Sequence, residues 1–236
     1  MTLNSKGVLF IVTGHHYTAA AVEAAESIKR TNPTLKLGIF TDQNIVNPLF
    51  VFVGKIDGGG ARRKHEFLGK SPFAQTLYLD SDIRVTGDLE DLFRILERYE
   101  IAGAYVRYRT LAKRLKSHSG DVPQAFPQIN CGVMLYKKCE RVDALFRAWI
   151  DLYSEGGFKR DQAPFREVLW KSDVRLYILA PEYNMRDIPI WPSKEPLPKI
   201  LHIKSFHAKS AFVRWRLKIL LLPIMWRLRR ATKDVH

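Results

Sequence analysis

Short apolar runs alternate with helix-like stretches through the first half of the chain, and this order is the strongest constraint on its fold. The apolar runs at 8–13 and 36–40 are separated by an alanine- and glutamate-rich stretch at 18–30. Because a strand, a helix and a second strand in this order are typical of a parallel sheet flanked by helices, we predict an α/β fold. Further strands are expected at 49–53, 76–79, 101–106, 130–136 and 174–179, and further helices at 61–69, 89–99, 142–153 and 161–170.

The length of 236 residues allows one sizeable core and is short for two domains. We therefore predict one domain at 1–210, followed by a basic tail at 211–236. Cys131 and Cys139 are too few for a disulfide framework, and the apolar run at 8–12 is shorter than a signal-peptide core. These features favour a cytoplasmic setting.

The formal net charge of +14 indicates an anionic partner, such as nucleic acid, phospholipid headgroups or a phosphorylated substrate. Composition does not choose among these. The charged side chains of 107–116 are all basic, and we predict an exposed basic flap there.

Asp80 and Asp82 follow directly after the buried strand predicted at 76–79. Open α/β sheets bind ligands at the carboxyl ends of their strands, and two carboxylates separated by one residue can reach one hard cation. Such a cation would neutralise a diphosphate. The triplet alone is weak evidence, because aspartate is also a common turn former and helix cap.

The sequence Tyr78-Leu79-Asp80-Ser81-Asp82-Ile83 closely resembles the metal-binding segment of glycosyltransferases with the GT-A fold. The similarity is greatest to family eight, which includes glycogenin and bacterial lipooligosaccharide galactosyltransferases. It recurs in order along residues 8–209. The further matching segments are Thr13-Gly14-His15-His16-Tyr17, Lys64 at sixteen positions before Asp80, Asn130-Cys131-Gly132-Val133-Met134, Asp161-Gln162, Tyr183-Asn184 and His202.

This resemblance implies a GT-A fold and transfer of a hexose from a nucleotide sugar, with UDP-glucose or UDP-galactose as the usual donor, to a glycan or lipid-linked acceptor. Asp80, Asp82 and His202 would hold the metal, and two carboxylates with one imidazole suit Mn²⁺ or Mg²⁺, the nitrogen favouring Mn²⁺. The residues implied to bind the donor are Thr13, Tyr17, Lys64, Asp80, Ser81, Asn130, Asp161 and Gln162.

The family also implies that the anomeric configuration is retained, with Gln162 and Asp161 as the catalytic pair. A neutral amide is a poor nucleophile, so we favour departure and attack on the same face of the sugar. One departure concerns the pyrophosphate lysine. The family continues its late histidine with glycine and Lys-Pro-Trp, whereas this chain leaves Lys204 and Lys209 as alternatives.

Each candidate also has a structural interpretation without chemistry. Histidine after an apolar strand is often a packed core residue, which applies to His202. Asp161 could cap the following helix, and Asn130 could satisfy a strand-end backbone group. Lys64 lies in a basic cluster, where a solvated face is the default. Tyr17 could be a packing residue.

Two other functions remain open. A sugar-phosphate nucleotidylyltransferase shares the fold type but carries a glycine-rich, arginine-containing loop after its first strand, which residues 13–17 lack. A non-enzymatic module that binds membrane or nucleic acid would explain the charge but not the ordered matches. We expect no nucleic-acid partner.

Aromatic and aliphatic residues recur at helical spacing between Phe212 and Trp226, beside many arginines and lysines. This pattern predicts a basic helix in the interface of an anionic membrane, and thus peripheral attachment to its inner face. The apolar run is too short to span a bilayer. A final helix docked on the core is the alternative.

Overall fold

A seven-stranded sheet forms the centre of the computed structural model, which describes residues 5–57, 64–106, 119–126, 128–158, 160–186 and 197–203. The strand order is β3-β2-β1-β4-β7-β6-β8. Its strands are β1 (Lys6–Val12), β2 (Lys36–Thr41), β3 (Phe52–Lys55), β4 (Gln75–Leu79), β6 (Ile101–Tyr105), β7 (Ile129–Lys137) and β8 (Leu176–Ile178).

The sheet is mainly parallel, as predicted, but β7 runs against both of its neighbours. It pairs antiparallel with β4, where Leu79 lies opposite Val133, and with β6. The start of β7 therefore lies beside the end of β4. A parallel β7 would have placed its first residues at the opposite edge of the sheet.

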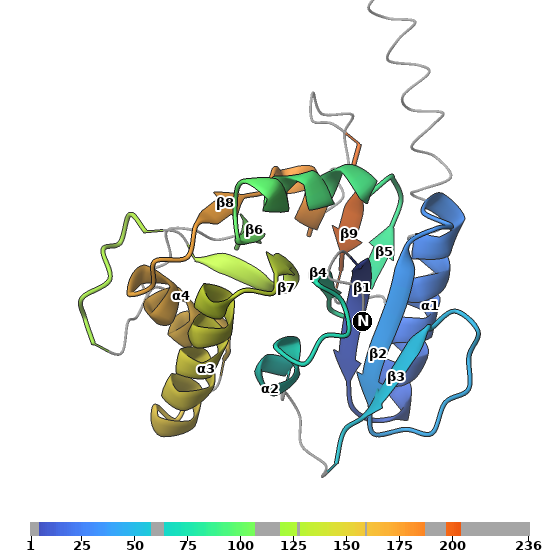
Figure 1. The fold of residues 1–236 in the computed structure, drawn as a ribbon, viewed down its shortest axis with the longest axis horizontal. Helices are drawn as coiled ribbons and strands as arrows, with labels where there is room; N and C mark the ends of the chain where they lie inside the picture. The colour runs from blue at the N-terminus through green and yellow to red at the C-terminus, as the bar shows by residue number, and fades with distance from the viewer. Residues whose placement is uncertain are drawn as a thin grey trace, which may run out of the picture.

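Helices cover both faces of this sheet (Figure 1). Side chains alternate along β1, so that Val8 and Phe10 enter one buried cluster while Leu9 and Ile11 enter the other. The first cluster includes residues of α1 (His15–Thr31) and of the 3-10 helix η1 (Glu90–Glu97), and the second those of α2 (Lys64–Leu68), α3 (Glu140–Glu155) and α4 (Gln162–Trp170). Burial on both faces explains why these strands read as continuous apolar runs.

A second, two-stranded sheet pairs β5 (Ile83–Val85) antiparallel with β9 (Ile200–His202). The short 3-10 helix η3 (Pro181–Asn184) lies beside β9, since Met185 forms an isolated bridge with Leu201. The sequence did not indicate β5 or η3, because each is only three or four residues long.

Two predicted elements differ from the structure. The strand expected at 49–53 is found at Phe52–Lys55, because residues before it form a turn in which Asn47 accepts hydrogen bonds from the backbone of Leu49 and Phe50. Buried Phe50 packs edge-on against Phe10 from this turn. The helix expected at 89–99 is the shorter η1, and just before it the side chain of Asp88 accepts a hydrogen bond from the backbone N–H of Glu90.

The predicted basic flap at 107–116 and the tail at 211–236 lie outside the described residues, as do Lys204 and Lys209. The division into a domain at 1–210 and a tail therefore stays a prediction. Within the described part of the chain, no helix combines the length and apolar character that crossing a membrane requires.

Candidate metal and donor site

Asp80, Asp82 and His202 meet at the carboxyl edge of the central sheet. One ligand-type atom of each lies within 4.8 Å of the others. Nε2 of His202 is 3.1 Å from Oδ1 of Asp82 and 3.8 Å from Oδ2 of Asp80. Two carboxylates and an imidazole form a donor set suited to a divalent cation such as Mn²⁺ or Mg²⁺.

Strand pairing brings these residues together across more than a hundred positions of sequence. The two aspartates lie between β4 and β5, and β5 places Ile83 directly opposite His202 on β9. The backbone N–H of Ile203 also donates to the carbonyl of Asp82, at 3.0 Å. His202 is 2 % exposed, but its buried ring faces the carboxylates, so it is not merely a packed core histidine.

Gly132 makes room for this cluster. Its carbonyl accepts a hydrogen bond from the backbone N–H of Asp80, at 2.9 Å. A Cβ at this position would collide with Cε1 of His202 and Oδ2 of Asp80. The sequence showed Gly132 only as part of a matching segment, and its steric role depends on the β4–β7 pairing. The absence of a Cβ at Gly132 is therefore what lets the His202 ring and the Asp80 carboxylate approach the backbone of β7 so closely.

Lys64 links the candidate metal cluster of Asp80, Asp82 and His202 to α4. Its Nζ lies 2.7 Å from Oδ2 of Asp161 and 3.5 Å from Oδ1 of Asp80, and it donates to the carbonyl of Cys131 at 2.9 Å. The side chain is 14 % exposed, so the solvated-face interpretation is wrong. Burial disfavours its charge, but the neighbouring carboxylates prevail and raise the pKa of Lys64 well above its ordinary value. Lys64 is therefore an ammonium.

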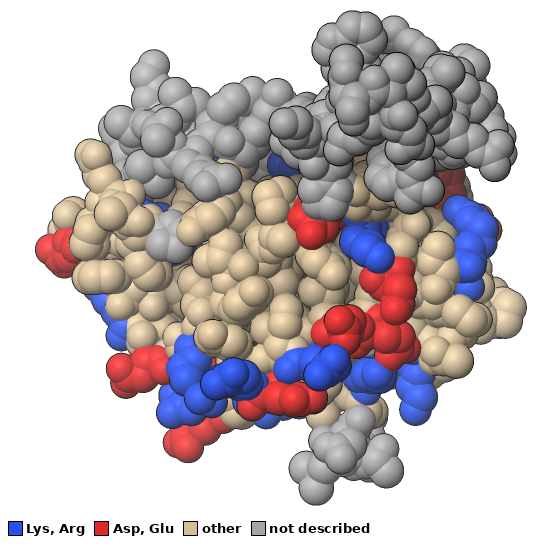
Figure 2. Space-filling model, turned by 90° about the horizontal axis from the view of Figure 1, so that it is seen from above, with Lys and Arg blue, Asp and Glu red and all other residues tan. Residues whose placement is uncertain are grey.

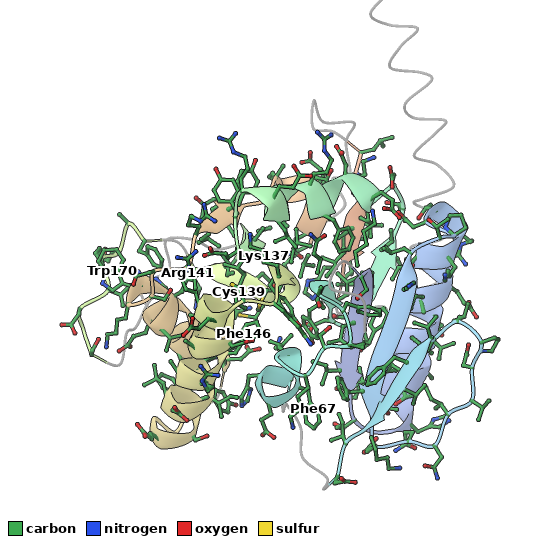
Figure 3. The ribbon with its side chains drawn as sticks, in the orientation of Figure 1. Phe67, Lys137, Cys139, Arg141, Phe146 and Trp170 are labelled. Carbon is green, nitrogen blue, oxygen red and sulfur yellow. The ribbon has the colours of Figure 1, made fainter. Side chains whose placement is uncertain are left out.

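Packing of α2 against α3 and β2 holds Lys64 in place. Phe67 of α2 contacts Phe40 of β2 with ring centroids 5.1 Å apart, and Phe146 of α3 joins the same buried cluster (Figure 3). His65, next to Lys64, contacts the ring of Tyr153 at 4.5 Å. The buried side chains of α2 thus fix this short helix against the core, and its first residue, Lys64, is held at the site.

Asp161 and Gln162 begin α4 at the same edge. The side chain of Asp161 makes no capping hydrogen bond, which excludes the simple cap interpretation, and its carboxylate pairs with Lys64 instead. Its carbonyl accepts a hydrogen bond from Nε1 of Trp149, at 3.0 Å. Gln162 is half-buried as the first residue of the helix.

Asn130, Ser81 and Tyr78 surround the first aspartate. Oδ1 of Asn130 accepts a hydrogen bond from the backbone of Gly132 at 2.8 Å, so the backbone-satisfying interpretation of Asn130 is correct for that atom. Ser81 is buried between the two aspartates. The hydroxyl of Tyr78 donates to Oδ1 of Asp80 at 2.6 Å, and burial together with that carboxylate raises the pKa of Tyr78 well above its usual range. Tyr78 therefore remains a donor.

Thr13 and Tyr17 lie at the carboxyl end of β1, which runs parallel to β4 and so ends at the same edge. Tyr17 is 50 % exposed, so it is not a core packing residue. Gly14 adopts a φ of 83°, a left-handed conformation that favours glycine, and its N–H donates to Oδ1 of Asp42 at 2.8 Å. Hydrogen bonds from Gln43 and Gly14 lower the pKa of Asp42 and keep it ionised. We did not predict Asp42 as a site residue.

No family model and no curated protein sequence matches the chain. Among solved structures, it is similar to apo glycosyltransferase GlyE of Streptococcus pneumoniae, with 24 % identity and a TM-score of 0.60 over 84 % of this chain and 54 % of that one. The chain thus spans about half the length of GlyE.

Two further solved structures show a similar likeness over more of their own chains. LgtC, a galactosyltransferase solved with donor and acceptor sugar analogues, has 14 % identity and a TM-score of 0.62, covering 84 % of this chain and 87 % of that one. Mouse xyloside xylosyltransferase 1 has 16 % identity and a TM-score of 0.56, covering 84 % and 97 %. These similarities confirm the predicted GT-A fold.

Proposed function

We propose that the protein is a metal-dependent glycosyltransferase, which moves a hexose from a nucleotide-diphosphate sugar to a glycan or lipid-linked acceptor with retention of configuration. The observation that carries this proposal is the convergence of Asp80, Asp82 and His202 with Lys64 and Asp161 at one edge of a GT-A sheet. The solved neighbours of this fold are glycosyltransferases, and the galactosyltransferase among them binds donor and acceptor analogues.

The charges of the site suit a departing diphosphate. A divalent metal held by Asp80, Asp82 and His202 would supply Lewis-acid polarisation of the phosphate oxygens, and we propose Mn²⁺, with Mg²⁺ as the alternative. Lys64 adds a fixed ammonium, whose position is set in advance by Asp161 and the carbonyl of Cys131. Positive charge that is already in place stabilises the leaving group as its negative charge grows.

The sugar would lie between the carboxyl edge of β4 and the start of α4. Asp161 is engaged by Lys64, and an ion-paired carboxylate is a weaker nucleophile than a free one. Gln162 is a neutral amide. Both facts favour the same-face mechanism, in which Asp161 and Gln162 position the sugar and stabilise its developing positive charge, while the leaving phosphate accepts the proton of the acceptor.

The nucleobase would bind at the carboxyl end of β1, near Thr13 and exposed Tyr17. Asp42, whose carboxylate is fixed by Gly14, is a further candidate for a base contact. We propose a UDP-sugar on the basis of the family resemblance. The nucleotidylyltransferase alternative gains no support, because the loop after β1 lacks the arginine-containing glycine-rich sequence.

The decisive experiment is to incubate the purified full chain with Mn²⁺ and a panel of nucleotide sugars, and to measure slow donor hydrolysis. We expect one UDP-sugar to be hydrolysed, with loss of nearly all activity in chelator and in Asp80→Asn or Asp82→Asn. Asp91→Asn is the matched control, because Asp91 is an exposed carboxylate of η1 that pairs with Arg94. Full turnover by both site variants, or in chelator, would remove the proposal.

A further inference from the structure

The 3-10 helix η3 and the residue after it, Met185, are joined to β9 and to Lys199 just before it by backbone hydrogen bonds. The N–H of Lys199 donates to the carbonyl of Glu182, that of Met185 to Ile200, and that of His202 to Met185, each at 2.8 Å. These bonds hold η3 in a constant register against β9. Asn184, the last residue of η3, is thereby fixed beside the ring of His202.

Asn184 and His202 form a hydrogen bond that determines where the ring carries its proton. Oδ1 of Asn184 lies 2.9 Å from Nδ1 of His202, and both residues are buried. Because a carboxamide oxygen can only accept, Nδ1 must be the donor. In the neutral ring, Nε2 then carries the lone pair, and this atom faces Asp82 and Asp80.

The other polar atom of Asn184 gives an independent indication. Asn184 is 6 % exposed, and its Nδ2 has no hydrogen-bond partner among the described residues. A buried unpaired donor destabilises the folded state. The unpaired Nδ2 therefore reduces what Asn184 contributes to stability, while Oδ1 of the same side chain is bonded to His202. This combination indicates a role at the site rather than in the core.

We propose that Asn184 is a positioning residue, which fixes His202 in the Nδ1-protonated tautomer and in the ring orientation that presents Nε2 to a divalent cation. The inference rests on the proposed function, since that cation is the metal of the proposed reaction. A hydrogen bond to the second nitrogen of a ligating imidazole fixes its tautomer and raises its basicity. Asn184 and His202 are eighteen residues apart in the sequence, so this role of Asn184 can be assigned only from the folded structure.

The first measurement needs no metal. In the metal-free full chain with Asp80→Ala and Asp82→Ala, the two carboxylates that would draw a proton to Nε2 are removed, and the ¹⁵N chemical shifts of His202 at a pH where the ring is neutral report the tautomer that Asn184 sets. In this background we expect the Nδ1-protonated form with Asn184 and with Asn184→Asp, which keeps an accepting oxygen, and a mixture with Asn184→Leu. An Nε2-protonated ring beside Asn184 overturns the proposal.

The second measurement is Mn²⁺ affinity by calorimetry. Removal of such a hydrogen bond typically weakens metal binding about 10- to 100-fold, which we expect for Asn184→Leu and not for Asn184→Asp. Asn32→Leu is the matched control, because Asn32 is also buried but bonds to the backbone of Gly87 and Leu89, away from the site. It should lower stability and leave the Mn²⁺ affinity unchanged.

Wild-type affinity and an unchanged tautomer in Asn184→Leu would refute the proposal. An equal loss of affinity in Asn32→Leu would do the same, because it would reduce the effect to general destabilisation. Absence of Mn²⁺ binding by the wild type would instead contradict the proposed metal site, whereas the tautomer measurement would still decide the assignment of Asn184.

Discussion

Both space and charge restrict which residues the site can contain, and Gly132 illustrates the restriction by space. The conformation of Gly132 is not left-handed, so it is the missing Cβ that is required there. Asp80 and His202 would both have to move to admit a methyl group. Because both are candidate metal ligands, the effect of a substitution should reach the metal directly.

Gly132→Ala is therefore expected to weaken Mn²⁺ binding and to reduce donor turnover about 100-fold, the effect of displacing reacting groups by about 1 Å. Gly69→Ala serves as the control, because a Cβ there would meet Phe146 at 3.9 Å, an ordinary contact. The measurements are Mn²⁺ titration and initial rates. Normal Mn²⁺ affinity in Gly132→Ala would show that metal binding does not depend on the missing Cβ at this position.

The restriction by charge can be tested at Lys64. Lys64→Met keeps much of the apolar stem but removes the ammonium between Asp80 and Asp161, so we expect kcat to fall by about 100-fold or more. Lys70→Met is the control, since exposed Lys70 lies over the ring of Phe67 at 4.5 Å, beyond the end of α2. Unchanged kcat and KM in Lys64→Met would exclude a role for Lys64 in the reaction.

At the scale of elements, α4 has two tasks, because it presents Gln162 at its first turn and holds the segment 119–126 along its length. Arg166 donates to the carbonyls of Phe126 and Pro123, and buried Glu167 accepts from the N–H of Ser119 at 3.2 Å. Phe126 also contacts the ring of Trp170 at 5.1 Å. Movement of this segment is therefore coupled to the helix that begins at the site.

Arg166→Met should release the segment, since it leaves two carbonyls without their donor. We expect the free energy of unfolding to fall by about 1–3 kcal/mol and proteolysis within 119–126 to accelerate. Exposed Arg147 of α3 provides the control as Arg147→Met. Equal denaturant midpoints and cleavage rates for the two variants would mean that Arg166 does not anchor the segment.

For the whole molecule, the excess positive charge is distributed unevenly. Residues 107–118 and 204–236 contain 14 of the 38 lysines and arginines but only Asp234 among the 24 acidic residues. By contrast, Figure 2 shows lysine and arginine interspersed with aspartate and glutamate on the face seen from above. The net charge of +14 therefore reflects these two segments more than the surface of the described fold.

Attachment of the tail to anionic lipid is a prediction that follows from this distribution. A chain truncated after Ser210 should sediment with anionic vesicles at least tenfold less than the full chain, because it lacks seven lysines and arginines and each cation near such a surface contributes about 1 kcal/mol. Neutral vesicles and high salt are the controls. Equal sedimentation of the two chains, or unfolding on truncation, would favour a tail docked on the core.

Sequence patterns alone determined the α/β class, most of the strands, and the carboxylates at the end of β4. These features are local, since burial on both faces produces apolar runs, and carboxylates that directly follow a strand, as Asp80 and Asp82 follow β4, lie at the edge of the sheet. Similarity to a family supplied the list of site residues. Neither source indicated Gly132 as a steric requirement or Asn184 as a partner of His202.

Only the tertiary structure decided which of these residues meet. The reversed direction of β7 placed Gly132 beside Asp80, and the pairing of β5 with β9 placed His202 opposite Ile83. Lys64, next to two other basic residues in the sequence, became the buried partner of Asp161 because α2 packs on α3. Strand direction and order depend on the free energy of the whole packed core, which no local periodicity records, so contacts between distant segments were visible only in the folded chain.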